Sequence, residues 1–234
     1  VIIGGFGSGA NPLIKYEGNV DGVFMLRSVV EDNIIFEDLN IDLISSSGYF
    51  GSFIESRTPS NHLFLRTNIR NSWTGIYGNP GEKGDLFFFV NSSFVEGARR
   101  ADVELDFIWH TGQRLVFLNS NFDGIQNTIL YGEVVRRALV HGNSFLNWGE
   151  GSKHSGLRLA WNNGLAGNIL VSGNRFIEGE GVGVEFTETS GHPSYNAGKN
   201  FLVEGNYFRK VGKTYGAAVF VANKGGPRDI VVRN

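Results

Sequence analysis

The sequence predicts an all-β fold, a parallel β-helix of about eight coils. A short motif recurs seven times and spaces its closing residues at intervals of 28, 25, 28, 23, 31 and 32. In each copy a hydrophobic run ends in a mostly polar residue, followed by any residue and then a large apolar one. The closing residues are Ile41, Ile69, Phe94, Phe122, Phe145, Phe176 and Phe208. Such a period indicates one supersecondary unit stacked on copies of itself, and no segment carries a convincing helical pattern.

Each coil is expected to contain two strands. Residues 167–176 and 199–208 both read as a strand, a Gly-Asn turn and an inward aromatic. Asn after Gly suits a turn position with positive φ. A variable polar loop then leads to a second strand of the form small, apolar, any residue, apolar. These second strands are expected at 22–25, 52–55, 75–78, 102–105, 128–131, 156–159, 183–186 and 218–221.

Side chains alternate across a strand, so each second strand contributes to an outward row. One row is predicted as Phe24, Phe53, Tyr77, Glu104, Leu130, Arg158, Glu185 and Phe220, and the next row contains Glu55 and Asp106. Charge gathers in the middle coils. We therefore expect a functional site there.

Composition narrows the classes of function. The unbroken repeat over residues 1–234 indicates a single domain, and the start inside an apolar strand without Met indicates an excerpt of a longer chain. The net charge of −2 and scattered basic residues argue against a nucleic-acid partner. Zero cysteines exclude disulfides and thiolate metal sites. The absence of any apolar run near 18 residues predicts no membrane span.

The Gly-Asn-x-Phe rhythm of the late coils and the glycine-rich opening at 4–14 resemble right-handed parallel β-helix proteins of the pectate-lyase-like superfamily. The resemblance covers essentially the whole chain. It implies a right-handed helix and an extracellular or cell-surface carbohydrate-active enzyme, a hydrolase or lyase acting on an acidic or uncharged polysaccharide. The Gly-His-Gly and Arg-Ile-Lys motifs of polygalacturonases and the Tyr-Gly-Phe-Asp-Pro-His motif of mannuronan epimerases do not appear in the sequence.

Three carboxylates share one predicted strand face, at Asp102, Glu104 and Asp106. Like charges this close raise at least one pKa, which suits a general acid. Neighbours on one strand face lie about 6.5–7 Å apart, within the range that inverting glycosidases use. We expect Glu104 and Asp106 to act as the acid–base pair and Asp102 to contact substrate. A solvated acidic face, or a cation site that organises a loop, is the alternative. No cofactor is predicted, and carboxylate-bound calcium stays open.

Other candidates flank this strand. Arg158 and Glu185 are expected in neighbouring rungs, either as a surface ion pair or as groups that position a sugar, with Arg158 binding a carboxylate or an enolate. His110 is a candidate general base or a hydrogen-bonded strand-end residue. The predicted substrate-binding residues are Tyr77, Trp109 and Trp161, which can stack on sugars or simply pack, together with Glu55 and Asp102.

A non-catalytic function remains the second hypothesis: an adhesin, a tailspike shaft or a filament subunit. No capping segment is recognised beside Val1 or Asn234, so unpaired strand edges are expected at both ends. Those edges call for end-to-end self-association or for further coils that cover them.

Overall fold

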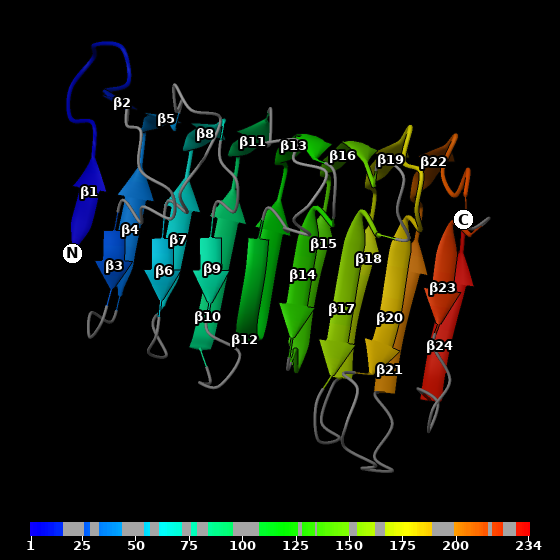
Figure 1. The fold of residues 1–234 in the computed structure, drawn as a ribbon. Coiled ribbons are helices and arrows are strands. Elements are labelled where there is room, and N and C mark those ends of the chain that lie inside the picture. The colour runs from blue at the N-terminus through cyan, green and yellow to red at the C-terminus, as the bar shows by residue number, and fades with distance from the viewer. Residues whose placement is uncertain are drawn as a thin grey trace.

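The protein is an all-β parallel solenoid, which confirms the predicted fold class (Figure 1). A computed structural model describes residues 1–15, 26–28, 33–43, 54–56, 61–71, 76–78, 84–95, 108–125, 128–133, 135–149, 154–161, 167–188, 199–214, 217–221 and 228–234. Every strand pair in these residues is parallel, and each partner lies in a neighbouring coil. The described part of the chain contains no helix with the length and apolarity that a membrane span needs.

Three parallel sheets run along the solenoid. Sheet 1 consists of β1 (Ile2–Gly4), β4 (Ile34–Glu37), β7 (His62–Leu65), β10 (Gly84–Val90), β12 (Ile108–Leu118), β15 (Arg137–His141), β18 (Gly167–Ser172), β21 (Lys199–Glu204) and β24 (Arg228–Arg233). Sheet 2 consists of β2 (Leu13–Lys15), β5 (Asn40–Asp42), β8 (Asn68–Arg70), β11 (Ser93–Val95), β13 (Asn121–Ile125), β16 (Ser144–Trp148), β19 (Arg175–Ile177) and β22 (Tyr207–Arg209). Sheet 3 consists of β3 (Leu26–Ser28), β6 (Ile54–Ser56), β9 (Ile76–Gly78), the first residues of β12, β14 (Leu130–Glu133), β17 (Leu157–Trp161), β20 (Val184–Glu188) and β23 (Val219–Val221). The long strand β12 therefore joins sheets 1 and 3.

A two-residue turn connects sheet 1 to sheet 2 in the seven coils whose sheet 1 strands are β4, β7, β10, β12, β15, β18 and β21, whereas residues 5–12 connect β1 to β2. The first turn residue adopts positive φ, and the second is buried. In the late coils the first residue is glycine, at 69° for Gly142 and 62° for Gly173. The sequence pattern assigned this backbone conformation to the asparagine, and that assignment is wrong. Glycine takes the left-handed position because it lacks Cβ, which leaves the asparagine free to point inward.

These buried second turn residues form a continuous hydrogen-bonded ladder, which we call the polar ladder. Its members are Thr67, Ser92, Ser120, Asn143, Asn174 and Asn206. The backbone N–H of each residue donates to the side-chain oxygen of the next, for example Asn143 N to Asn174 Oδ1 at 2.9 Å. The Asn174 Nδ2 group donates in turn to Val140 O and to Asn206 Oδ1, both at 2.9 Å. The ladder thus supplies hydrogen-bond acceptors to backbone N–H groups that are buried in the turns, where no water can accept from them.

The motif residues that close each repeat stack directly above one another in sheet 2. Their register pairs Phe122 with Phe145, Phe145 with Phe176 and Phe176 with Phe208. The ring centroids of the middle pair lie 4.7 Å apart, with planes only 3° from parallel. The predicted phenylalanine column is therefore confirmed as core from Phe94 to Phe176, next to the polar ladder, and Phe208 is partly buried against it.

Removing one rung of the polar ladder should destabilise the fold. The Asn174→Ala variant loses its donors to Val140 and Asn206 and strips the Asn143 N–H of its acceptor. We expect a loss of about 3 kcal/mol in the free energy of unfolding, measured by urea denaturation. The control Asn68→Ala removes an exposed side chain that bonds Asn40 and should cost about 1 kcal/mol or less. Equal losses in the two variants would contradict a structural role for the ladder.

A buried histidine predicts acid sensitivity. His62 in β7 is inaccessible to solvent, and desolvation lowers its pKa from 6.5 to about 4. Between pH 6.5 and pH 4 this histidine binds a proton in the unfolded chain but stays neutral in the folded chain. The free energy of unfolding therefore falls as the pH falls from 6.5 to 4, by roughly 3 kcal/mol in total. The His62→Leu variant should lose this component, while His141→Gln, at an exposed site, should keep it. Urea midpoints measured across this window would refute the assignment if wild type and His62→Leu gave parallel pH profiles.

Candidate functional site

One row of sheet 3 gathers most of the chemistry predicted for the middle coils. The Cα register runs from Tyr77 to Trp109, from Trp109 to Tyr131, from Tyr131 to Arg158 and from Arg158 to Glu185. Glu55 pairs with Tyr77 on one side, and Phe220 pairs with Glu185 on the other. We call the seven positions from Glu55 to Phe220 the sheet 3 row. Beyond Glu55 the register continues to Arg27, which holds the position predicted for Phe24. Because rungs lie about 4.8 Å apart, the row presents one such residue per coil along a line of roughly 29 Å.

Arg158 lies between an aromatic ring and a carboxylate. Its guanidinium carbon is 4.8 Å from the centroid of the Tyr131 ring, a cation–π distance. On the other side, Arg158 Nε lies 3.6 Å from Glu185 Oε1. The Nε atom is buried and makes no hydrogen bond, so Glu185 balances its charge without a direct N–H···O bond. The stacking and the pairing together restrict where the guanidinium group can lie.

A second contact, from Ser155 in the preceding coil, also fixes the Glu185 side chain. The buried hydroxyl of Ser155 donates to Glu185 Oε2 at 2.5 Å, and the Glu185 side chain is only 14% exposed. Both carboxylate oxygens therefore face a donor or a cation. These contacts fix the orientation of the Glu185 carboxylate, which suits a residue that positions its neighbours.

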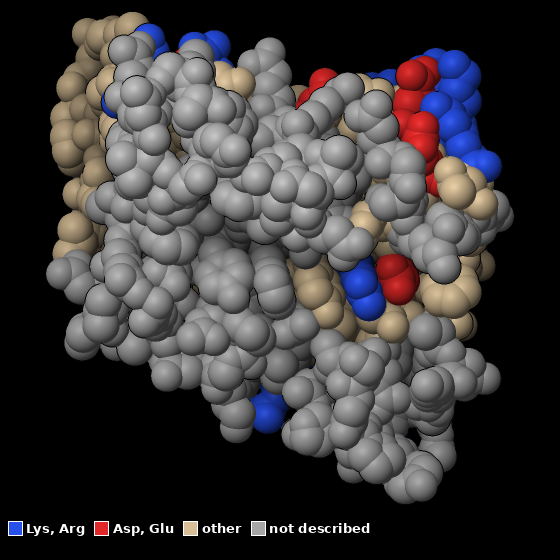
Figure 2. Space-filling view, in the orientation of Figure 1, with Lys and Arg blue, Asp and Glu red and all other residues tan. Residues whose placement is uncertain are grey.

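The rest of this surface is weakly charged where it is described. Figure 2 views the solenoid from the side of sheet 3, and a blue and a red side chain lie next to each other over β17 and β20, with uncharged described residues to the left and right. Leu157, Leu159, Val184 and Phe186 pack beneath them in the core, as the alternation of the two strands predicts. The ion pair is therefore carried on rigid, fully packed strands.

The structure corrects the predicted row at several positions. Tyr131, not Leu130, lies beside Arg158, and Leu130 is buried. Trp109 holds the position predicted for Glu104, and Glu55 the position predicted for Phe53. The offset between Leu130 and Tyr131 is one residue, which moves a side chain to the other face because side chains alternate with a period of two. The offsets at the other two positions are five and two residues, because the lengths of the variable loops leave the start of each sheet 3 strand undetermined in the sequence.

The remaining predicted site residues are placed only in part. Tyr77, Trp109 and Glu55 belong to the row by backbone register, and their side chains lie outside the described set. His110 is registered with Gly132, in the row of buried Leu159 and Phe186. Trp161 pairs with Glu188 at the end of β17. The acidic residues Asp102, Glu104 and Asp106 lie outside the described residues.

Tyr131 and Ser155, the residues that contact Arg158 and Glu185, were not identified from the sequence. The triplet Leu130-Tyr131-Gly132 repeats the pattern of Ile76-Tyr77-Gly78, and aligning the two would have placed Tyr131 in the row. No comparable pattern marks Ser155, because its role depends on the side chain of the next coil. Among the described residues, no group of three or more His, Asp or Glu side chains is arranged to hold a metal ion.

Comparison with known proteins adds no relatives: models of protein families, curated proteins and solved structures all give no match to this chain. The parallel β-solenoid itself is seen directly in the strand pairing. Function is accordingly inferred from the residues of the sheet 3 row.

The Arg158–Glu185 pair should show measurable coupling. In Glu185→Leu the half-buried guanidinium of Arg158 loses its counter-charge, so the Arg158→Leu/Glu185→Leu double variant should be destabilised by less than the sum of the two single variants. A double-mutant cycle in urea should give a coupling of about 1 kcal/mol, limited by solvent screening at Arg158. Strictly additive single and double variants would show that the two groups do not interact.

Proposed function

We propose that this protein is a carbohydrate-active β-solenoid that binds a polysaccharide along the sheet 3 row and cleaves it at the central coils. The observation that carries the proposal is the register that puts aromatic and charged residues in consecutive coils, from Tyr77 to Glu185. A glycan is a linear repeat, and a row with one side chain per coil offers it one contact per rung. Aromatic rings suit the apolar faces of sugars, and the charged groups suit their hydroxyls.

In this proposal Arg158 and Glu185 position the sugar, and Glu104 and Asp106, which precede β12 in the sequence, supply the acid–base pair. The resemblance to the pectate-lyase-like superfamily supports a right-handed solenoid of this kind acting outside the cell or at its surface. Tyr77, Trp109 and Trp161 would stack on sugar rings, with Glu55 and Asp102 at the flanks. Hydrolysis and β-elimination both remain candidates for the chemistry, and His110 is a second candidate base.

The ion pair also bears on the kind of sugar. Because Glu185 balances Arg158, the described part of the site is close to neutral, and Tyr131 already covers one face of the guanidinium. Binding that depends on hydroxyl hydrogen bonds and stacking is weakly screened by salt, whereas binding of a polyanion to free arginine is strongly screened. We therefore expect uncharged glycans to bind at least as well as uronate polymers.

A polysaccharide panel tests the proposal. Products are read both as new reducing ends, for hydrolysis, and as absorbance of unsaturated sugars, for elimination. Arg158→Ala should weaken binding roughly 10-fold, as loss of one charged contact predicts, while the control Arg209→Ala on sheet 2 should bind like wild type. The Glu104→Gln/Asp106→Asn double variant should lose at least about 100-fold in rate yet still bind.

Three results would contradict parts of this account. No binding to any glycan would remove the polysaccharide proposal. Binding without cleavage would favour the non-catalytic reading, an adhesin or shaft. Full activity of the Glu104→Gln/Asp106→Asn variant would remove these two residues from the mechanism.

A further inference from the structure

The outer face of sheet 1 carries an unbroken column of apolar side chains. The register aligns nine residues, one per strand: Ile2, Ile35, Leu63, Phe88, Val116, Leu139, Leu170, Leu202 and Val231. We call this column the outer stripe. On each inner strand its neighbours along the chain are buried, so alternation points the stripe away from the core.

The stripe is accessible to solvent. Its inner members are half-buried, and Ile2 and Val231 at its ends are 55% and 47% exposed. Sheet 2, by contrast, shows polar residues on its outer face, including Asn68, Ser93, Asn121 and Arg175. A contiguous apolar face of this length that is accessible to solvent marks an interaction site.

We propose that the outer stripe is the interface of a parallel homodimer, in which a second copy of this chain packs the same stripe against it, coil by coil. The first argument is size. Nine rungs about 4.8 Å apart and strands of about 15 Å give a footprint of roughly 600 Å² per copy, which reaches the range of stable interfaces. Two copies of this face also share the same spacing between strands, so their side chains can interdigitate where the two sheets pack together.

The second argument is the character of the side chains that flank the stripe. A twofold axis along the solenoid places the residue two positions before each stripe residue opposite the residue two positions after it in the other copy. In the four rungs from β7 to β15 the facing pairs are Asn61 with Leu65, Leu86 with Val90, Arg114 with Leu118, and Arg137 with His141. Leu65, Val90 and Leu118 therefore continue the apolar contact beside the stripe, and neither arginine faces its own copy.

The antiparallel alternative is disfavoured by the same residues. A copy turned end for end, with full overlap of the stripe, would put Arg114 opposite its own symmetry mate. Like charges facing each other at an interface lower affinity, so the parallel arrangement is the one the surface fits.

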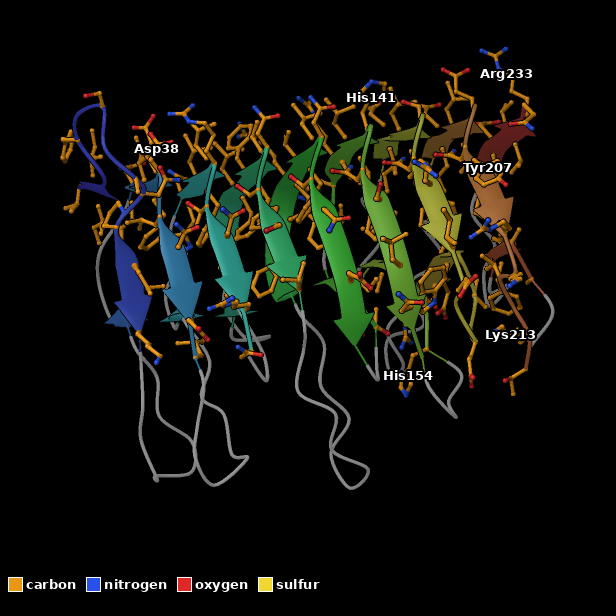
Figure 3. All side chains as sticks on the ribbon, turned by 90° about the horizontal axis from the view of Figure 1, so that it is seen from above. Asp38, His141, His154, Tyr207, Lys213 and Arg233 are labelled. Carbon is orange, nitrogen blue, oxygen red and sulfur yellow. The ribbon has the colours of Figure 1, made fainter. Side chains whose placement is uncertain are left out.

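This dimer leaves the proposed binding surface free. Asp38, His141 and Arg233 lie along the edge where sheet 1 turns into sheet 2, and His154 lies at the opposite edge near sheet 3 (Figure 3). The stripe lies on the outer face of sheet 1, and sheet 3 lies on the opposite side of the solenoid (Figure 1), so two copies joined through the stripe would present their sheet 3 rows outward.

Cross-linking tests the arrangement, because the chain contains no cysteine of its own. We prepare the single variants Ile35→Cys, Leu139→Cys and Leu202→Cys, and the control Leu146→Cys, which is half-buried on the outer face of sheet 2. A parallel dimer brings each stripe position next to its own copy. Mild oxidation should therefore yield disulfide-linked dimers from each stripe variant alone, at least about 10-fold faster than from the control. Circular dichroism confirms that each variant keeps its strands.

Sedimentation of the unmodified chain completes the test. The expected mass is twice the 25.7 kDa of one chain at micromolar concentration, and Val116→Lys should shift it to monomer while Leu146→Lys should not. Cross-linking of Ile35→Cys only when mixed with Leu202→Cys would overturn the parallel arrangement. A wild-type monomer at every concentration, with no excess cross-linking over the control, would overturn the proposal and leave the stripe to a partner other than a second copy.

Discussion

The polar ladder is the interaction on which the rest of this structure depends. From β4 to β21, each coil turns sharply from sheet 1 into sheet 2, and that turn buries backbone amides beside a phenylalanine core. Buried amides without acceptors are costly, so each turn needs an acceptor from the neighbouring coil. The inward oxygen of a Thr, Ser or Asn in the next turn supplies it, from Thr67 through to Asn206.

The ladder also sets the register of the solenoid. Its bonds connect equivalent turn residues, so a coil cannot slide by one residue without breaking them and turning its apolar side chains outward. The stacked phenylalanines of sheet 2 follow two residues after each ladder position and inherit the same alignment. Through the long strand β12, this alignment extends from sheet 1 to the row of Trp109, Tyr131 and Arg158 in sheet 3.

The sequence was informative where structure depends on contacts that every coil repeats. The closing residues from Ile41 to Phe208 all align as predicted, because the ladder and the core select the same residue types in each turn. The pairing of Arg158 with Glu185 was predicted correctly for the same reason, since their coils share the form apolar, charged, apolar. Tyr131 was missed because loops of variable length precede the sheet 3 strands and leave their phase undetermined. The outer stripe went unrecognised because alternating hydrophobic residues were assumed to have one apolar face, whereas the sheet 1 strands are apolar on both.

Backbone hydrogen exchange measured by NMR tests the ladder most directly. The amides of Ser120, Asn143 and Asn174 donate to side chains of the next coil, within a buried turn that lies between two sheets. If the ladder fixes the register, these amides exchange only through global unfolding and rank with the core strands in protection. Rapid exchange of the same amides through local opening, while the core strands stay protected, would contradict the account, because the turns would then be passive connections between sheets that align without them.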